Sequence, residues 1–132
     1  YVADTLNEMG LFLRLADVVV LGGSFGPVLG RPALGGHNPL EPARLGKPVI
    51  TGPDGANWKA VNAAMVEAGG LIQVAGFGDL PRVIAPLLMN PSAAKAMGER
   101  ARRAATEAAS GLDRLWAVLQ PLLPPAPARG RL

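Results

Sequence analysis

Three short apolar runs, each followed by glycine or proline and then by a helix-like segment, constrain the fold of this chain more than any other feature. The runs are 18–21, 48–51 and 71–74, and most of their positions hold β-branched residues. Runs of this length and composition are typical of buried strands. Because a helical segment lies between consecutive runs, we expect a parallel sheet with right-handed crossovers. The predicted fold class is therefore α/β.

Residues that start and stop helices bound the segments between these strands. A first helix is expected from about Thr5, where Glu8 completes a capping box, to Ala16. Gly111 is expected to break the helical C-terminal region into two parts, because glycine is a poor helix former. The remaining helices are expected at 38–46, 57–68, 79–88, 91–109 and 112–123.

The number of strands bears on domain organisation. Three are evident, whereas a complete doubly wound domain has about five or six, and the chain opens on Tyr1 rather than methionine. We therefore expect a Rossmann-like domain that is truncated at its N-terminus, with an open sheet edge that favours self-association. Residues 1–123 are expected to form this partial domain. Residues 124–132, rich in proline and arginine, are expected to be a disordered tail.

Composition argues against several classes of protein. The chain has no cysteine, which excludes disulfides and thiolate chemistry, and no apolar run reaches the roughly 18 residues of a membrane span. The net charge is +3, and the basic excess lies in residues 91–132. Aromatic side chains are not interleaved with these basic residues as a nucleic-acid groove requires, so no nucleic-acid partner is expected. The single histidine, His37, has no second ligand at metal-binding spacing, so no metal is expected.

The sequence GGHNPLEPARLGKPVITGP, which begins at Gly35, is the strongest candidate for a ligand site. It follows the first strand, and in open parallel sheets ligands bind beyond the carboxyl ends of the strands. Gly35 and Gly36 allow backbone N–H groups to approach a ligand closely. The helix expected to start at Asn38 directs its positive end to the same place. His37 adds a donor, and Glu41 adds an acceptor for sugar hydroxyls.

The same residues also have a purely structural interpretation. Asn38 and Glu41 form an Asn-x-x-Glu capping box, and the two glycines suit a tight turn. The segment 22–24 is not a full G-x-G-x-x-G pattern, and no P-loop lysine follows. Ser24 lacks a base and the G-x-S-x-G context of a hydrolase. From the residues alone, a ligand loop and a well-capped helix start both stay open.

The run GGHNPLEPARLGKPV, after a strand ending in GGS and preceded by DTLNEMGLFLRLAD, resembles the C-terminal domain of 3-deoxy-D-manno-octulosonic acid (Kdo) transferases of lipopolysaccharide synthesis. The similarity extends from about Tyr1 to Leu119. It implies the C-terminal, donor-binding half of a two-domain GT-B fold. It also implies a glycosyltransferase that moves Kdo from CMP-Kdo to a lipid A precursor at the cytoplasmic face of the bacterial inner membrane, without metal or other cofactor.

The resemblance also assigns residues. Glu8 and Met9 match the family's G-E-[LM]-G stretch beside the nucleotide, although Asn7 stands where the family has glycine. Asn38 and Glu41 are expected to make polar contacts with the nucleotide or the Kdo sugar. The resemblance implies that the family's catalytic acidic residue lies in the N-terminal domain, so this chain alone is expected to be inactive. The residues expected to line the CMP-Kdo site are Glu8, Met9, Gly23, Ser24, Gly35, Gly36, His37, Asn38 and Glu41.

Departures from the family pattern keep other functions open. The segment 24–35 is longer than usual and contains Arg31, and the sequence DGANW at 54–58 replaces the customary H-T-x-N-F. One alternative is a GT-B transferase or related enzyme that uses a UDP-sugar. Another is a non-catalytic nucleotide-binding module. A preference for CMP over UDP would distinguish the Kdo transferase from the first alternative.

Overall fold

The computed structural model describes Val2 and residues 7–122. Three strands form one parallel sheet in the order β1-β2-β3, and Val49 of the central strand pairs with Val19 and with Leu71. The α/β class with a parallel sheet is confirmed. The expected tail 124–132 lies outside the described residues. The strands are β1 (Val19–Val20), β2 (Val49–Thr51) and β3 (Leu71–Gln73).

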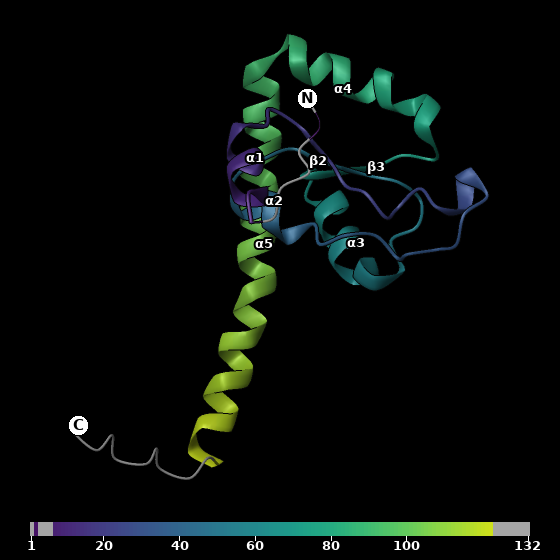
Figure 1. Ribbon diagram of the computed structural model, residues 1–132. Coiled ribbons are helices and arrows are strands. Elements are labelled where there is room, and N and C mark those ends of the chain that lie inside the picture. Colours follow the sequence, from purple (N-terminus) through teal and green to yellow (C-terminus); the bar gives the residue numbers. More distant parts are fainter. Residues whose placement is uncertain (1, 3–6, 123–132) are drawn as a thin grey trace.

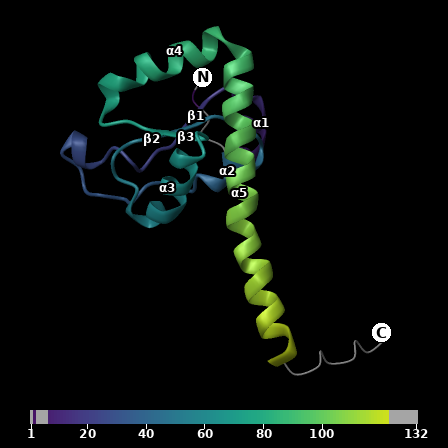
Figure 2. The ribbon, with the colours of Figure 1, turned by 180° about the vertical axis from the view of Figure 1, so that it is seen from behind.

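Five α-helices surround this sheet in the described part of the chain. In Figure 1, and from behind in Figure 2, α5 is the longest element, and its C-terminal half projects well away from the sheet and the other helices. Short 3-10 turns occupy 27–29, 56–58, 77–79 and 120–122. The helices are α1 (Met9–Leu15), α2 (Leu40–Arg44), α3 (Lys59–Glu67), α4 (Leu80–Met89) and α5 (Pro91–Leu119).

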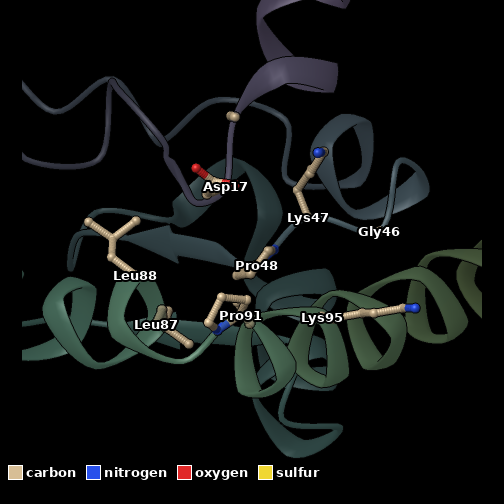
Figure 3. A pocket seen from close by; sticks show the side chains of 10 residues that line it. Asp17, Gly46, Lys47, Pro48, Leu87, Leu88, Pro91 and Lys95 are labelled. Atoms are coloured by element: carbon tan, nitrogen blue, oxygen red, sulfur yellow. The ribbon is translucent and has the colours of Figure 1, made fainter.

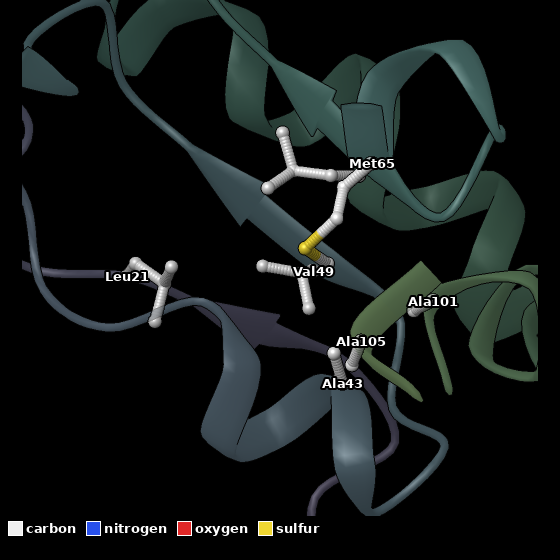
Figure 4. Close-up of a cluster of buried hydrophobic side chains, with 7 residues drawn as sticks. Leu21, Ala43, Val49, Met65, Ala101 and Ala105 are labelled. Carbon is white, nitrogen blue, oxygen red and sulfur yellow. The ribbon is translucent and has the colours of Figure 1, made fainter. Parts of the chain in front are cut away.

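The sheet separates two apolar clusters. Val49 and Ile50 are both fully buried, and because successive side chains of a strand point to opposite faces, each belongs to a different cluster. Side chains from α2, α3 and α5 cover the Val49 face (Figure 4), whereas α4 covers the Ile50 face. The first cluster contains Leu21, Ala43, Val49, Met65, Leu71, Ala101 and Ala105.

Small residues let α5 approach the backbone of the domain. Ala101 and Ala105 are fully buried, and a Cβ built on Gly98 would collide with the carbonyl oxygen of Gly46. Gly46 follows α2 with φ at +67°, the left-handed conformation that ends a helix. A Cβ built on Gly70 would likewise meet the backbone of Ala101. The close packing of α5 therefore depends on glycine and alanine at its contact positions.

Two expected elements differ at the start of the chain. Helix α1 begins at Met9 with Glu8 as its N-cap residue, so Glu8 does not occupy the third helical position. Asn7 adopts a left-handed φ of +69°, which a helical residue cannot have. Thr5 lies outside the described residues. Strand β1 is short and is an outer strand of the sheet rather than a fully buried one, and Val20 is 39% exposed.

The expected break at Gly111 is also wrong, because α5 runs without interruption from Pro91 to Leu119. A glycine inside a helix costs only about 1 kcal/mol relative to alanine. Helix-forming residues on both sides outweigh that cost. The start of α5 is capped by Asn90, whose Oδ1 accepts the N–H of Ala93 at 3.1 Å.

Candidate functional site

Hydrogen bonds join the loops that follow β1 and β2, at the carboxyl ends of these strands. Asp54 Oδ2 accepts hydrogen bonds from the N–H groups of Leu34 and Gly35, each at 2.9 Å. In return, the Asn57 N–H donates to the Gly35 carbonyl at 3.1 Å, and Asn57 Nδ2 donates to the Leu34 carbonyl at 2.9 Å. Four hydrogen bonds thus fix the loop that carries the glycine pair.

Ser24 also makes hydrogen bonds that join these two loops. Its Oγ donates to the Leu21 carbonyl at 2.7 Å and accepts the Gly52 N–H at 2.9 Å, while its side chain is completely buried. The Ser24 carbonyl accepts the Asp54 N–H at 3.0 Å. Because both partners of the hydroxyl belong to the protein, the Ser24 side chain holds the ends of β1 and β2 rather than presenting a polar group at the surface.

Gly35 and Gly36 are required for the shape of the loop. Both are buried and have φ near +75° and +77°, where other residues are strained. A Cβ on Gly35 would lie 2.5 Å from the Asn57 side chain, and one on Gly36 would lie 3.0 Å from the Asp54 carbonyl oxygen. The glycines therefore allow two loops to pack tightly.

The backbone N–H groups of this loop are already used. The Gly35 N–H donates to Asp54, as described above. The Gly36 N–H donates to the Gly23 carbonyl at 3.1 Å, and the His37 N–H donates to the Gly22 carbonyl at 3.2 Å. The expectation that N–H groups of the glycine pair face a ligand is therefore not met, because the loop itself takes them.

A groove of about 500 Å³ opens between α1, the end of β1 and the start of α2, and we call it the α1–α2 groove. Among the residues expected from sequence, it brings together Met9, Gly36, His37, Asn38 and Glu41. The complete lining is Met9, Leu13, Val19, Val20, Leu21, Gly22, Gly36, His37, Asn38, Glu41, Pro42 and Trp58.

The polar groups of the groove come from the first residues of the α2 region. Asn38 Oδ1 accepts the Leu40 N–H at 2.9 Å, and Asn38 Nδ2 donates to Glu41 Oε1 at 3.4 Å. The Glu41 residue is exposed. The His37 ring lies against Gly23, since a Cβ there would be 3.1 Å from His37 Cδ2. The N-cap residue of α2 is Pro39 rather than the expected Asn38, but Asn38 Oδ1 still accepts the N–H of Leu40, the first residue of that helix, and its Nδ2 orients Glu41 at the groove.

The other expected site residues lie outside the groove lining. Glu8 is the N-cap residue of α1, and its carbonyl accepts N–H groups of that helix. The loops after β1 and β2 are held by hydrogen bonds that involve Gly23, Ser24 and Gly35. Trp58 was not among the expected site residues, although it lines the groove. The sequence signal for Trp58 is its position, since it stands where the family's H-T-x-N-F stretch also has an aromatic residue.

A separate cavity of about 320 Å³ lies at the other end of the strands (Figure 3). It adjoins Asp17 and Pro48, which precede β1 and β2, so it is at the amino ends of the strands. Lys47 Nζ, beside it, donates to the Arg14 carbonyl at 2.8 Å. Parallel sheets bind ligands at the other end of their strands, so this cavity is not the candidate site.

Within Val2 and residues 7–122, no three His, Cys, Asp or Glu side chains gather closely enough to hold a metal ion. None of the helices over that same part of the chain is both long enough and apolar enough to cross a membrane.

No family model matches the chain. It is 31% identical over 121 residues to the 3-deoxy-D-manno-octulosonic acid transferase of Haemophilus influenzae, covering 91% of this chain and 27% of that protein. The enzyme of the same name from Bordetella pertussis is 36% identical over 111 residues, covering 84% and 24%. That of Rickettsia typhi is 32% identical over 126 residues, covering 94% and 26%. The chain thus spans about a quarter of the length of these curated relatives.

One solved structure is similar in fold and sequence. It is the C-terminal CMP-Kdo binding domain of WaaA from Acinetobacter baumannii, with a TM-score of 0.71 and 26% sequence identity. The similarity covers 79% of this chain and 51% of that one.

Proposed function

We propose that this chain forms the donor-binding part of a 3-deoxy-D-manno-octulosonic acid transferase and binds CMP-Kdo in the α1–α2 groove. The premise is that the chain is a homologue of these transferases. The observation that carries the proposal is the convergence of His37, Asn38 and Glu41 on one groove at the carboxyl edge of the sheet. That edge is where open α/β sheets bind nucleotides.

The groove has the chemistry that a nucleotide needs. Met9 and Trp58 supply apolar surface for a flat base. Glu41, oriented by Asn38, accepts hydrogen bonds from the hydroxyls of ribose or of the sugar. His37 donates to the phosphate, because one ring nitrogen carries a proton even when the imidazole is neutral. Recognition thus rests on side chains rather than on the loop N–H groups.

The reaction that fits is transfer of Kdo from CMP-Kdo to a lipid A precursor. As CMP leaves, negative charge grows on its phosphate, and a donor fixed beside that phosphate stabilises the transition state. His37 is the donor on this chain. The acceptor hydroxyl needs a general base, and we assign that base to the N-terminal domain of the complete enzyme. The complete enzyme would act at the cytoplasmic face of the inner membrane, where its lipid acceptor lies.

Calorimetric titration with CMP and with UDP tests the proposal. We expect CMP to bind more tightly than UDP, and Glu41→Gln to weaken CMP binding about tenfold or more, because hydrogen bonds to a charged acceptor are strong. The matched control is Glu67→Gln, an exposed residue at the end of α3 that does not line the groove. It should leave CMP affinity unchanged. Tighter binding of UDP would point to a UDP-sugar enzyme, and an unaffected Glu41→Gln variant would exclude the groove.

A further inference from the structure

Residues 27–34 form a protruding loop in which all eight consecutive residues are exposed, and we call it the 27–34 loop. This segment, coloured blue, extends to one side of the sheet in Figures 1 and 2. Its larger apolar side chains, those of Val28, Leu29 and Leu34, are 47%, 52% and 64% exposed. None of its residues lines the α1–α2 groove, so the donor site does not explain this apolar surface.

Hydrogen bonds and close packing give the 27–34 loop one defined shape. The Gly26 carbonyl accepts the N–H of Leu29 at 3.0 Å and the N–H of Arg31 at 2.8 Å. A Cβ built on Gly26 would collide with the Pro32 carbonyl oxygen, and the ring of the preceding Phe25 is buried. The bonds from the loop after β2, described above, hold the other end. A loop held this firmly that leaves its apolar side chains exposed is pre-organised for a partner.

The backbone of the loop has few free hydrogen-bond donors. Pro27 and Pro32 have no N–H group. The N–H groups that bond to Gly26, to Pro27 or to Asp54 are those of Leu29, Gly30, Arg31 and Leu34. Six of the eight residues therefore offer no free donor. Unpaired polar groups are costly to transfer from water to an apolar medium, so this backbone is suited to contact with such a medium.

Arg31 gives the loop its charge. It is the single Lys, Arg, Asp or Glu residue between positions 18 and 40, and it makes no ion pair with a described residue. The other side chains of the loop have no polar atom. A protein interface usually needs several hydrogen bonds, which these side chains cannot make. An anionic phospholipid bilayer needs aliphatic surface for its acyl chains and a cation for its phosphates, and the loop has both.

We propose that the 27–34 loop inserts Val28, Leu29 and Leu34 into the surface of an anionic phospholipid bilayer, with Arg31 bound to lipid phosphates. The proposed function assigns no surface of this chain to a membrane, so the inference goes beyond it. The loop follows β1 at its carboxyl end, where the α1–α2 groove also opens. Insertion therefore brings that end of the sheet toward the bilayer. A few aliphatic side chains and one cation give weak, reversible binding.

A second exposed apolar surface, near the end of α5, is the alternative contact with a bilayer. Unlike the 27–34 loop, it lies on the part of α5 that projects away from the sheet (Figure 1). The test must therefore locate the contact as well as detect binding. The exposed apolar residues of this surface are Leu115, Trp116, Val118, Leu119 and Leu122.

The chain has no cysteine, so one introduced cysteine gives a unique position for a fluorescent label. An environment-sensitive label at Ala33→Cys reports on the loop and one at Leu119→Cys reports on α5, while Val66→Cys on α3 is the matched exposed control. Each labelled chain is mixed with vesicles of phosphatidylcholine with or without phosphatidylglycerol, and with or without a nitroxide quencher on the acyl chains. With phosphatidylglycerol present, we expect a blue shift and quenching at position 33 and neither at position 66.

Variants of the chain labelled at position 33 separate insertion from charge attraction. Leu29→Ser should weaken vesicle binding about tenfold, because burial of a leucine side chain is strongly favourable. Arg31→Gln should weaken binding to phosphatidylglycerol vesicles about fivefold and make it less sensitive to salt. The matched control is Arg103→Gln, an exposed arginine of α5, which should leave vesicle binding unchanged. Because all three positions are exposed, the melting temperature should not change.

Other results would overturn the inference. Absence of quenching at position 33 at any lipid concentration would exclude insertion of the loop. Quenching at position 119 without quenching at position 33 would assign the contact to α5. Unchanged vesicle binding of both Leu29→Ser and Arg31→Gln would exclude the contacts proposed here. Failure of the proposed function appears separately, as loss of CMP binding by a chain whose label at position 33 is still quenched.

Discussion

Asp54 Oδ2 accepts a hydrogen bond from the N–H of Gly35 at 2.9 Å, and this bond joins the loop after β2 to the loop after β1. Gly36 and His37, which line the α1–α2 groove, follow Gly35 directly along the chain. One wall of the groove is therefore positioned by a residue that does not line it.

Replacing Asp54 tests this relationship. Asp54→Ala removes the acceptor of two backbone N–H groups, so we expect a loss of about 1–3 kcal/mol in the free energy of unfolding. CMP affinity should fall several-fold because the groove wall loosens. Urea denaturation and calorimetry measure the two effects. Asp17→Ala, at an exposed position on the opposite edge of the sheet, should change stability by less than about 0.5 kcal/mol. Equal effects of the two changes would contradict the account.

Ser24→Ala distinguishes the structural role of this hydroxyl from the ligand role that its sequence context suggests. The buried Gly52 N–H loses its partner, so the free energy of unfolding should fall by about 1–3 kcal/mol. CMP affinity measured well below the melting temperature should change little. Unchanged stability together with a large loss of CMP affinity would show that Ser24 contacts the nucleotide instead.

The hydrogen-bond partners of Ser24 could not be predicted from the sequence, although the fold could. The order of strands and helices was predictable, because it follows from local apolar patterns and from glycine and proline positions. The partners of Ser24 Oγ and of the Gly35 N–H were not, because Gly52 and Asp54 lie 28 and 19 residues further along the chain. Such pairings depend on tertiary packing, which no local motif encodes.

The resemblance predicted more of the residues that line the α1–α2 groove than the local patterns did. It named Met9, which lies far in sequence from Asn38 and Glu41 yet lines the same groove. Local patterns leave Asn38 and Glu41 between a helix cap and a ligand site; in the structure Asn38 hydrogen-bonds the first N–H of α2 and also lines the α1–α2 groove. Trp58 was missed because an aromatic residue after a glycine-rich loop has many structural uses.

Gly98→Ala tests the packing of α5 against the domain. On an exposed helix this change would stabilise the protein by about 1 kcal/mol. Here the new Cβ would collide with the Gly46 carbonyl oxygen, so we expect destabilisation by about 1–3 kcal/mol. Thermal or urea denaturation gives the sign. The matched control is Gly10→Ala in α1, where the new Cβ would meet only the end of the long, exposed Arg14 side chain, at 3.0 Å from Nη1. Gly10→Ala should be neutral or stabilising, and the same sign at both positions would refute the packing argument.

The start of α4 should respond to acid through Asp79. Arg82 Nη2 donates to Asp79 Oδ1 at 3.1 Å, and this hydrogen bond holds the pKa of Asp79 below its ordinary value of 3.8. Because the pKa is lower in the folded state than in the unfolded state, the charged carboxylate stabilises the fold above about pH 4. That contribution is lost as the pH falls through the lowered pKa.

An NMR titration of the Asp79 carboxyl carbon checks this prediction. Arg82→Gln should raise the pKa of Asp79 toward its ordinary value, because the largest cause of the lowering is removed. Arg103→Gln, on α5, should leave the pKa of Asp79 unchanged. A pKa of Asp79 that is the same with and without the Arg82 guanidinium would rule out this cause.

Binding of CMP-Kdo in the α1–α2 groove is tested most directly by a backbone amide NMR titration of the chain with CMP-Kdo. We expect saturable shifts at Met9, Gly22, Gly36, His37, Glu41 and the Trp58 indole, and none around Lys47 and Lys95 at the amino ends of the strands. Shifts centred on Lys47 and Lys95, or no shift at any donor concentration, would contradict it.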